Sequence, residues 1–98
     1  MRLTNYEILS IKKVFEEVFG NGKIYLFGSR IDDTKRGGDI DLYIDLDTTL
    51  TIKEQMNLKT SFRLRLYDLI GEQKIDIVIS KDKDRSIEKE ILKTGVIL

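Results

Sequence analysis

Apolar residues near the N-terminus recur with the period of a helix. One face of this segment collects the recurring apolar positions Ile8, Ile11, Phe15, Val18 and Phe19. Thr4 with Glu7 three residues later has the form of a capping box, and Gly20 is a stop signal. The spacing therefore predicts a first helix over about residues 5–19.

Three shorter segments have the pattern of strands. Residues 23–27 form a β-branched and aromatic run that ends at Gly28. Residues 39–45 alternate strictly, with Ile40, Leu42 and Ile44 on one face and aspartates on the other. Residues 75–79 alternate in the same way around Asp76 and Val78. We expect three strands, the second with its carboxylates on the face opposite its apolar residues.

Two further helices complete the pattern. Thr51 and Glu54 repeat the capping box, and a long helix follows that ends at Gly71. Its apolar stripe is Leu58, Phe62, Leu66, Leu69 and Ile70. Asp84 or Ser86 is expected to cap a last helix. This helix contains Ile87, Ile91 and Leu92 and stops at Gly95, before an apolar tail, 96–98.

The element order is thus α-β-β-α-β-α. It predicts an α/β (α+β) fold with a short mixed β-sheet packed against helices, in one domain over residues 1–98. We expect any module that selects a substrate to be supplied separately, since one core uses the whole length.

The amino-acid composition limits which partners and metal ligands are expected. Lysines plus arginines number 17 and aspartates plus glutamates also 17, so the net charge gives no support for a general nucleic-acid-binding surface. The chain has no cysteine and no histidine, which leaves only oxygen ligands for a metal. No apolar run approaches the roughly 20 residues that span a bilayer, so we expect a cytoplasmic protein without a membrane anchor.

The candidate chemistry lies in three aspartates. Asp39 and Asp41 fall on one face of the second strand, with Cβ atoms roughly 7 Å apart, and repel each other unless a cation lies between them. Asp76 is a lone acid in an apolar run, where burying an unpaired carboxylate costs several kcal/mol. If the third strand lies beside the second, Asp76 joins the pair. Such a cluster suits Mg²⁺, and two ions about 3.5 to 4 Å apart activate an attacking hydroxyl and neutralise a leaving pyrophosphate.

A glycine turn precedes these aspartates. Gly28-Ser29-Arg30 follows the first strand, where glycine lets backbone amides approach phosphate oxygens and the serine hydroxyl adds a hydrogen bond. Arg30, Lys35 and Arg36 are candidates for further phosphate contacts. The alternative is that Gly28 only serves a turn and the basic residues are solvated.

Other acidic and aromatic residues have simpler interpretations. Asp45 and Asp47 are read as a solvated turn or cap at the end of the second strand. Tyr25 and Tyr43 are interpreted as packing residues of the strands, although Tyr43 shares the aspartate face, where it is a candidate to flank a nucleotide.

The chain resembles the nucleotidyltransferase superfamily over roughly residues 24–79. The resemblance lies in the Gly-Ser pair, the Asp-Ile-Asp sequence that begins at Asp39, and the later Asp76. That superfamily includes DNA polymerase beta, the CCA-adding enzymes and kanamycin nucleotidyltransferase. The resemblance implies that Gly28 and Ser29 bind the triphosphate, that Asp39 and Asp41 bind both metal ions, and that Asp76 completes the site. Gly38 stands where many relatives have serine, which removes a hydroxyl but no metal ligand.

The short chain looks most like the stand-alone minimal nucleotidyltransferases, which resemble the antitoxins of toxin–antitoxin pairs with a HEPN ribonuclease. The resemblance implies transfer of AMP from ATP to a tyrosine of that toxin. The sequence is compatible with a homo- or a hetero-oligomer and does not select between them. Two alternatives stay open. One is a binding module that neutralises its toxin by contact through its apolar tail or a helix face. The other is a nucleotidyltransferase acting on a small hydroxyl compound, such as an aminoglycoside, or on an RNA end.

Overall fold

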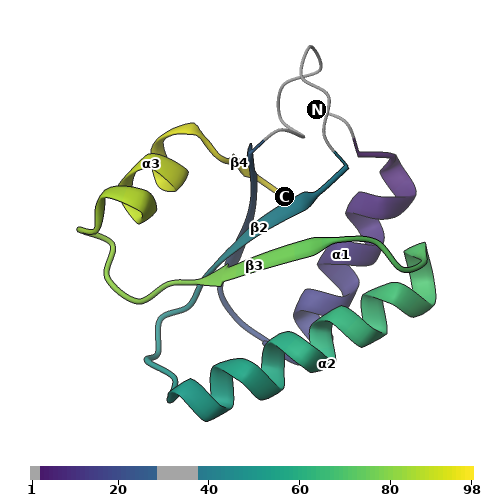
Figure 1. Cartoon of the computed structure of the whole chain (residues 1–98), viewed down its shortest axis with the longest axis horizontal. Coiled ribbons are helices and arrows are strands. Elements are labelled where there is room, and N and C mark those ends of the chain that lie inside the picture. The colour runs from purple at the N-terminus through teal and green to yellow at the C-terminus, as the bar shows by residue number, and fades with distance from the viewer. Residues whose placement is uncertain (1–2, 29–37) are drawn as a thin grey trace.

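The structure, a computed structural model, describes residues 3–28 and 38–98. Its elements follow in the order α1 (Asn5–Val18), β1 (Lys23–Phe27), β2 (Ile40–Asp45), α2 (Ile52–Ile70), β3 (Ile75–Ile79), α3 (Ser86–Thr94) and β4 (Val96–Ile97) (Figure 1). The mixed α/β fold is confirmed, and the predicted elements lie within a residue or two of their expected bounds. The added element is β4.

Both predicted capping boxes form. The Thr4 hydroxyl accepts a hydrogen bond from the Glu7 N–H at 3.1 Å, and the Thr4 N–H donates to the Glu7 carboxylate at 2.9 Å. Thr51 and Glu54 make the same reciprocal pair at 3.1 and 3.0 Å. Each box satisfies two N–H groups that would otherwise lack partners, which fixes where α1 and α2 begin.

The sheet has the strand order β3-β2-β1-β4. β1 pairs with β2 and with β4 in antiparallel fashion, whereas β2 and β3 are parallel. The parallel pair is joined by α2, because a parallel neighbour requires a crossover that returns the chain to the same end of the sheet. Consequently β2 and β3 begin at the same end of the sheet, next to the last residues of β1.

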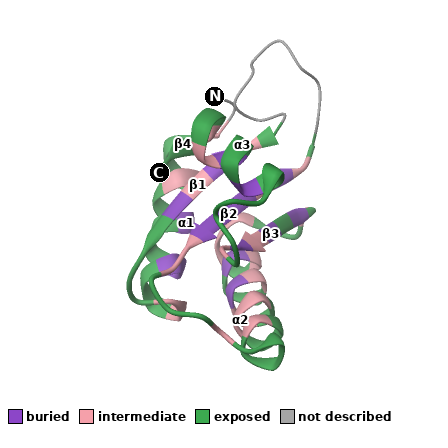
Figure 2. Cartoon of the chain, turned by 90° about the vertical axis from the view of Figure 1, so that its left-hand side faces the viewer, coloured by how far each residue is buried: buried purple, intermediate pink, exposed green. Residues whose placement is uncertain are grey.

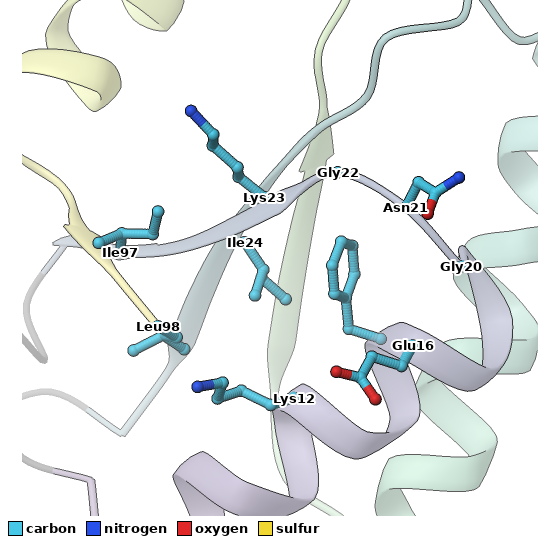
Figure 3. Close-up of a pocket in the computed structure, with 10 residues that line it drawn as sticks. Lys12, Glu16, Gly20, Asn21, Gly22, Lys23, Ile24, Ile97 and Leu98 are labelled. Carbon is cyan, nitrogen blue, oxygen red and sulfur yellow. The ribbon is translucent and has the colours of Figure 1, made fainter.

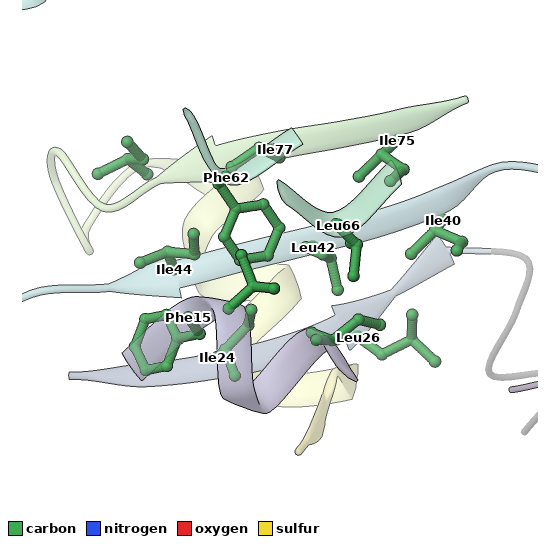
Figure 4. Packing of buried hydrophobic residues seen from close by; sticks show 13 residues of the cluster. Phe15, Ile24, Leu26, Ile40, Leu42, Ile44, Phe62, Leu66, Ile75 and Ile77 are labelled. Carbon is green, nitrogen blue, oxygen red and sulfur yellow. The ribbon is translucent and has the colours of Figure 1, made fainter. Parts of the chain in front are cut away.

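The main core lies between one face of the sheet and the two longer helices, α1 and α2 (Figure 4). Every second residue of β1, β2 and β3 points into it, as strand geometry requires. Its buried members are Ile11, Val14, Phe15, Ile24, Leu26, Ile40, Leu42, Ile44, Phe62, Leu66, Ile75, Ile77 and Ile79. Phe62 and Leu66 of α2 are fully buried, so truncation of either to alanine is expected to cost about 2 to 5 kcal/mol.

The short helix α3 is held on the opposite face of the sheet, beside β1 and β2 (Figure 2). Tyr43 of β2 is fully buried there and donates a 2.7 Å hydrogen bond to Glu88 of α3, which is also fully buried. Ile91 of α3 is buried as well, but it lies outside the main core cluster. Tyr43 therefore packs under α3, and the idea that it flanks a nucleotide is wrong.

The start of α3 differs from the prediction. Its N-cap is Arg85, which makes no side-chain cap, so neither Asp84 nor Ser86 has the expected role. The segment is organised instead by the Glu88 carboxylate, which accepts N–H hydrogen bonds from Lys81 at 3.1 Å and Asp82 at 2.9 Å. The Arg85 guanidinium also donates to it, at 2.9 and 2.8 Å.

Two other expectations are corrected at the ends of strands. The apolar tail is the edge strand β4, in which Val96 pairs with Leu26 and Ile97 with Tyr25. Asp45 is not solvated, since its side chain is only 12% exposed and forms a 2.9 Å ion pair with Lys83. Within residues 3–28 and 38–98, no helix is long and apolar enough to cross a membrane.

Candidate active site

The candidate residues lie at the end of the sheet where β2 and β3 begin and β1 ends. Asp41 pairs in register with Asp76 on one side and with Phe27 on the other. Period-two geometry directs both carboxylates to the face that bears α3, away from the main core. Asp41 is half-buried, whereas Tyr43, two residues further along the same face, is fully buried by α3. This end of the face is therefore accessible to a ligand.

The electrostatics of Asp41 are those of a crowded anion. Its pKa is raised, first by burial, then by the charge of Asp76 and that of Asp39, and also by a hydrogen bond to the Asp76 carboxyl. Lys74 acts in the opposite direction and lowers it. Burial and the two neighbouring carboxylates outweigh Lys74, so among the described residues the surroundings of Asp41 disfavour its ionised form.

Asp39 lies just before β2 and pairs with a basic residue. Its Oδ2 is 3.3 Å from the Lys74 Nζ, which belongs to the residue before β3. The backbone supports this pair, because the Ile40 N–H donates to the Lys74 carbonyl at 3.0 Å. Asp39 therefore contributes charge to the cluster around Asp41 while its own carboxylate is held by Lys74.

Asp76 is exposed, which corrects the expectation that it is buried in an apolar strand. Alternation along β3 sends Ile75, Ile77 and Ile79 into the core and leaves Asp76 on the opposite face. Its place in the cluster follows from its register with Asp41 and not from a burial penalty.

Gly28 lies against Asp41 for a steric reason. Its φ of 79° is in the left-handed region that favours glycine. A Cβ at this position would collide with the Asp41 Oδ2 and lie 3.1 Å from the Asp41 Cγ. The glycine is thus required by the close approach of β1 to the carboxylate. The other predicted phosphate-binding residues, Ser29, Arg30, Lys35 and Arg36, lie outside the described residues.

The donor set fits a hard divalent cation in its chemistry, since it consists of the carboxylate oxygens of neighbouring aspartates. Within the described ranges, no group of three or more acidic residues is arranged to hold a metal. Asp39 is instead paired with Lys74. A cation that used the Asp39 Oδ2 together with Asp41 and Asp76 would therefore have to displace Lys74 from this oxygen.

Lys74 is the residue of this region that sequence reasoning missed. A period-two signal was present, because Lys74 precedes Asp76 by two residues and falls on the same strand face. The strand register then explains why Lys74 meets Asp39. Ile40 pairs with Ile75, so the residues that precede them, Asp39 and Lys74, lie side by side.

A hollow of about 270 Å³ lies elsewhere, among the end of α1, the start of β1 and β4 (Figure 3). It is lined by Lys12, Glu16, Lys23 and Leu98, among others, and is at the end of β1 remote from Gly28. Glu16 is its one acidic side chain among the described residues, so it offers no paired carboxylates. The accessible acidic face, not the hollow, is the better candidate for chemistry.

Comparison with known families shows to which family the chain belongs. Residues 10–98 match the family model described as polymerase beta, nucleotidyltransferase. The chain belongs to this family. The match includes β1, β2 and β3 with Gly28, Asp39, Asp41 and Asp76, and it supports nucleotidyl transfer as the general activity of this nucleotidyltransferase domain. No curated protein matches the chain.

Proposed function

We propose that this nucleotidyltransferase domain uses Asp39, Asp41 and Asp76 to position Mg²⁺ and the phosphates of a nucleoside triphosphate, and transfers the nucleotidyl group to a hydroxyl. The observation that carries the proposal is the register of Asp41 and Asp76, which sets two carboxylates side by side on the accessible face. Membership of the family supplies the reaction class.

The roles of the residues follow from their positions. Asp41, between Gly28 and Asp76, would contact a cation on the accessible side, and Asp39 would join once it leaves Lys74. Asp76, the exposed member, is the best placed to accept a proton from an incoming hydroxyl. When bound, the divalent ions activate that hydroxyl and neutralise charge on the departing pyrophosphate.

At the glycine turn, the proposed contacts are to the triphosphate. Gly28 brings the backbone close to Asp41, so a phosphate held there would lie next to the carboxylates. We assign the neighbouring Ser29 and Arg30 to the same triphosphate, on the basis of their place in the Gly-Ser motif.

For the donor and acceptor, we propose ATP and a tyrosine hydroxyl of a HEPN-family toxin, so that the chain acts as an antitoxin by adenylylation. The support is the resemblance of the motif to minimal nucleotidyltransferases. In this reaction the tyrosine oxygen forms a bond to the α-phosphorus of ATP, the bond to pyrophosphate breaks, and the hydroxyl proton passes to a base.

The test is incubation of the purified chain with Mg-ATP and a HEPN protein encoded beside it, followed by intact-mass measurement. We expect the HEPN protein to gain mass in adenylyl steps, and the Asp39→Asn, Asp41→Asn double variant to abolish the gain. Asp84→Asn is the matched control, because Asp84 is an exposed aspartate in the turn after β3, at the other end of the sheet. A gain that persists in the double variant would contradict the assignment of the site.

A second candidate, neutralisation of the toxin by contact, is favoured by one observation. Ile52 and Met56 are 77% and 63% exposed and lie four residues apart on α2, so they share a helix face. Tight complex formation without a mass gain, retained by the Asp39→Asn, Asp41→Asn variant and lost by Ile52→Ser with Met56→Ser, would favour contact over modification.

A further inference from the structure

Lys74 provides a positive charge inside the acidic cluster. Its Nζ lies 3.3 Å from the Asp39 Oδ2. The pKa of Lys74 is raised by its hydrogen bond to Asp39 and by the charges of Asp39, Asp76 and Asp41. One ammonium group therefore interacts with all three carboxylates that the proposed function assigns to metal ions.

The ion pair between Lys74 and Asp39 is weak enough for another cation to displace the lysine. The Lys74 and Asp39 side chains are 68% and 43% exposed, and exposed ion pairs are weak because water screens them. The backbone position of Lys74 is nonetheless fixed, since its carbonyl accepts the Ile40 N–H at the start of the β2–β3 ladder. The ammonium is thus tethered near the carboxylates by a flexible side chain.

We propose that Lys74 is the resident counter-cation of the Asp39, Asp41 and Asp76 cluster and competes with the divalent ion for Asp39. This inference rests on the proposed function for the identity of the competing ion. The lysine keeps the carboxylates from repelling one another when no metal is bound. Binding of a divalent ion displaces the ammonium from Asp39, since two like-charged cations cannot share one carboxylate oxygen at low cost.

The first test is calorimetric titration of Mg²⁺ into the full chain without nucleotide. We expect Lys74→Met to bind Mg²⁺ with a Kd about fivefold lower than the original chain, because a nearby positive charge has been removed. Lys74→Arg should stay near the original Kd. Lys89→Met is the matched control, because Lys89 is exposed on α3, and it should leave the Kd unchanged. An unchanged or higher Kd in Lys74→Met would overturn the competition.

The second test is thermal unfolding in EDTA, which needs no metal site. Lys74→Met should melt at a lower temperature than Lys89→Met, and added Mg²⁺ should remove the difference. In an Asp39→Asn background the effect of Lys74→Met should shrink, because part of the repulsion has been deleted. Equal melting temperatures for Lys74→Met and Lys89→Met in EDTA would overturn the counter-cation role.

The two tests separate the inference from the proposed function. If the original chain binds Mg²⁺ and Asp41→Asn does not, the proposed metal site stands whatever the Lys74 variants do. If the original chain binds no Mg²⁺, the proposed metal site and the competition both fail. The melting curves in EDTA then decide the counter-cation role alone.

Discussion

Gly28 and Asp41 approach each other so closely that a Cβ on the glycine would lie 3.1 Å from the Asp41 Cγ and collide with its Oδ2. The contact joins the end of β1 to the start of β2, at the edge that carries the acidic cluster. Any side chain at position 28 must displace the carboxylate, so this glycine is linked sterically to the candidate site.

Gly28→Ala is therefore expected to damage both stability and activity. Left-handed backbone costs a non-glycine residue about 1 to 2 kcal/mol, and the collision adds to this. Displacement of Asp41 should lower nucleotidyl transfer by about 100-fold. Gly20→Ala is the matched control, since Gly20 has φ 81° with no atom within 4 Å of its virtual Cβ. Urea unfolding and transfer rates of the two variants should show that only Gly28→Ala loses activity.

Asp41→Asn should stabilise the metal-free chain while abolishing its activity. Burial and the neighbouring carboxylates raise the pKa of Asp41 above its ordinary value of 3.8. Its contribution to stability is thus fully present below pH 3.8 and is lost as pH rises through the raised pKa. At pH 7 in EDTA we expect a higher melting temperature for Asp41→Asn and a transfer rate reduced by more than about 100-fold. A lower melting temperature would contradict the inference that the ionised Asp41 carboxylate destabilises the metal-free fold.

Tyr43→Phe tests the attachment of α3. The Tyr43 hydroxyl donates to the buried Glu88 carboxylate, so its removal should cost about 1 to 3 kcal/mol in the free energy of unfolding. Tyr25→Phe is the control, because the Tyr25 ring lies 6.0 Å from that of Tyr43 but is only half-buried. We expect a change within about 0.5 kcal/mol for Tyr25→Phe. Similar losses in the two variants would argue against a specific role for the hydrogen bond.

Glu88 should make the fold sensitive to acid. Burial raises the pKa of Glu88, but hydrogen bonds from the Asp82 N–H, Tyr43, the Lys81 N–H and Arg85 outweigh burial and bring it from 4.5 to about 2. A depressed pKa contributes stability that is present above pH 4.5 and lost as pH falls toward 2. The shift corresponds to about 3 kcal/mol.

Urea unfolding at several pH values measures this dependence. Glu88→Gln should be less stable than the original chain at pH 7 and should show a smaller loss between pH 4.5 and 2. Glu90→Gln, at an exposed position of the same helix, should keep the original pH profile. An unaltered profile in Glu88→Gln would assign the acid sensitivity to other groups.

Most of the fold was predictable because its signals are local. The capping boxes at Thr4 and Thr51 define the starts of two helices, and alternation along β2 separates Ile40, Leu42 and Ile44 from the aspartates. Each signal involves residues that are neighbours in the chain. The pairing of Asp41 with Asp76 was expected only on the condition that β3 lies beside β2, and the structure meets that condition.

The features that were missed depend on tertiary contacts. Glu88 has the sequence context of an ordinary surface glutamate, and only its contact with Tyr43, 45 positions away, explains its burial. The tail 96–98 forms β4 because the edge of β1 was free to accept it, which no pattern in three residues encodes. The local pattern at the end of β2 favours a solvated Asp45, because its partner, Lys83, lies in a turn distant in sequence. Ser29 and Arg30 lie outside the described residues, so their assignment stays a prediction.

The parallel pairing of β2 with β3 also limits when the acidic pair can exist. Asp41 and Asp76 meet only after α2 has carried the chain back across the sheet, and contacts of such long sequence separation are slow to form. The pairing of β1 with β2 spans a shorter stretch of chain than the pairing of β2 with β3, which must wait for the whole of α2. Until β3 docks, Asp41 lies on an unprotected sheet edge without its acidic neighbour, so competence to bind a divalent ion is expected to arise late in folding.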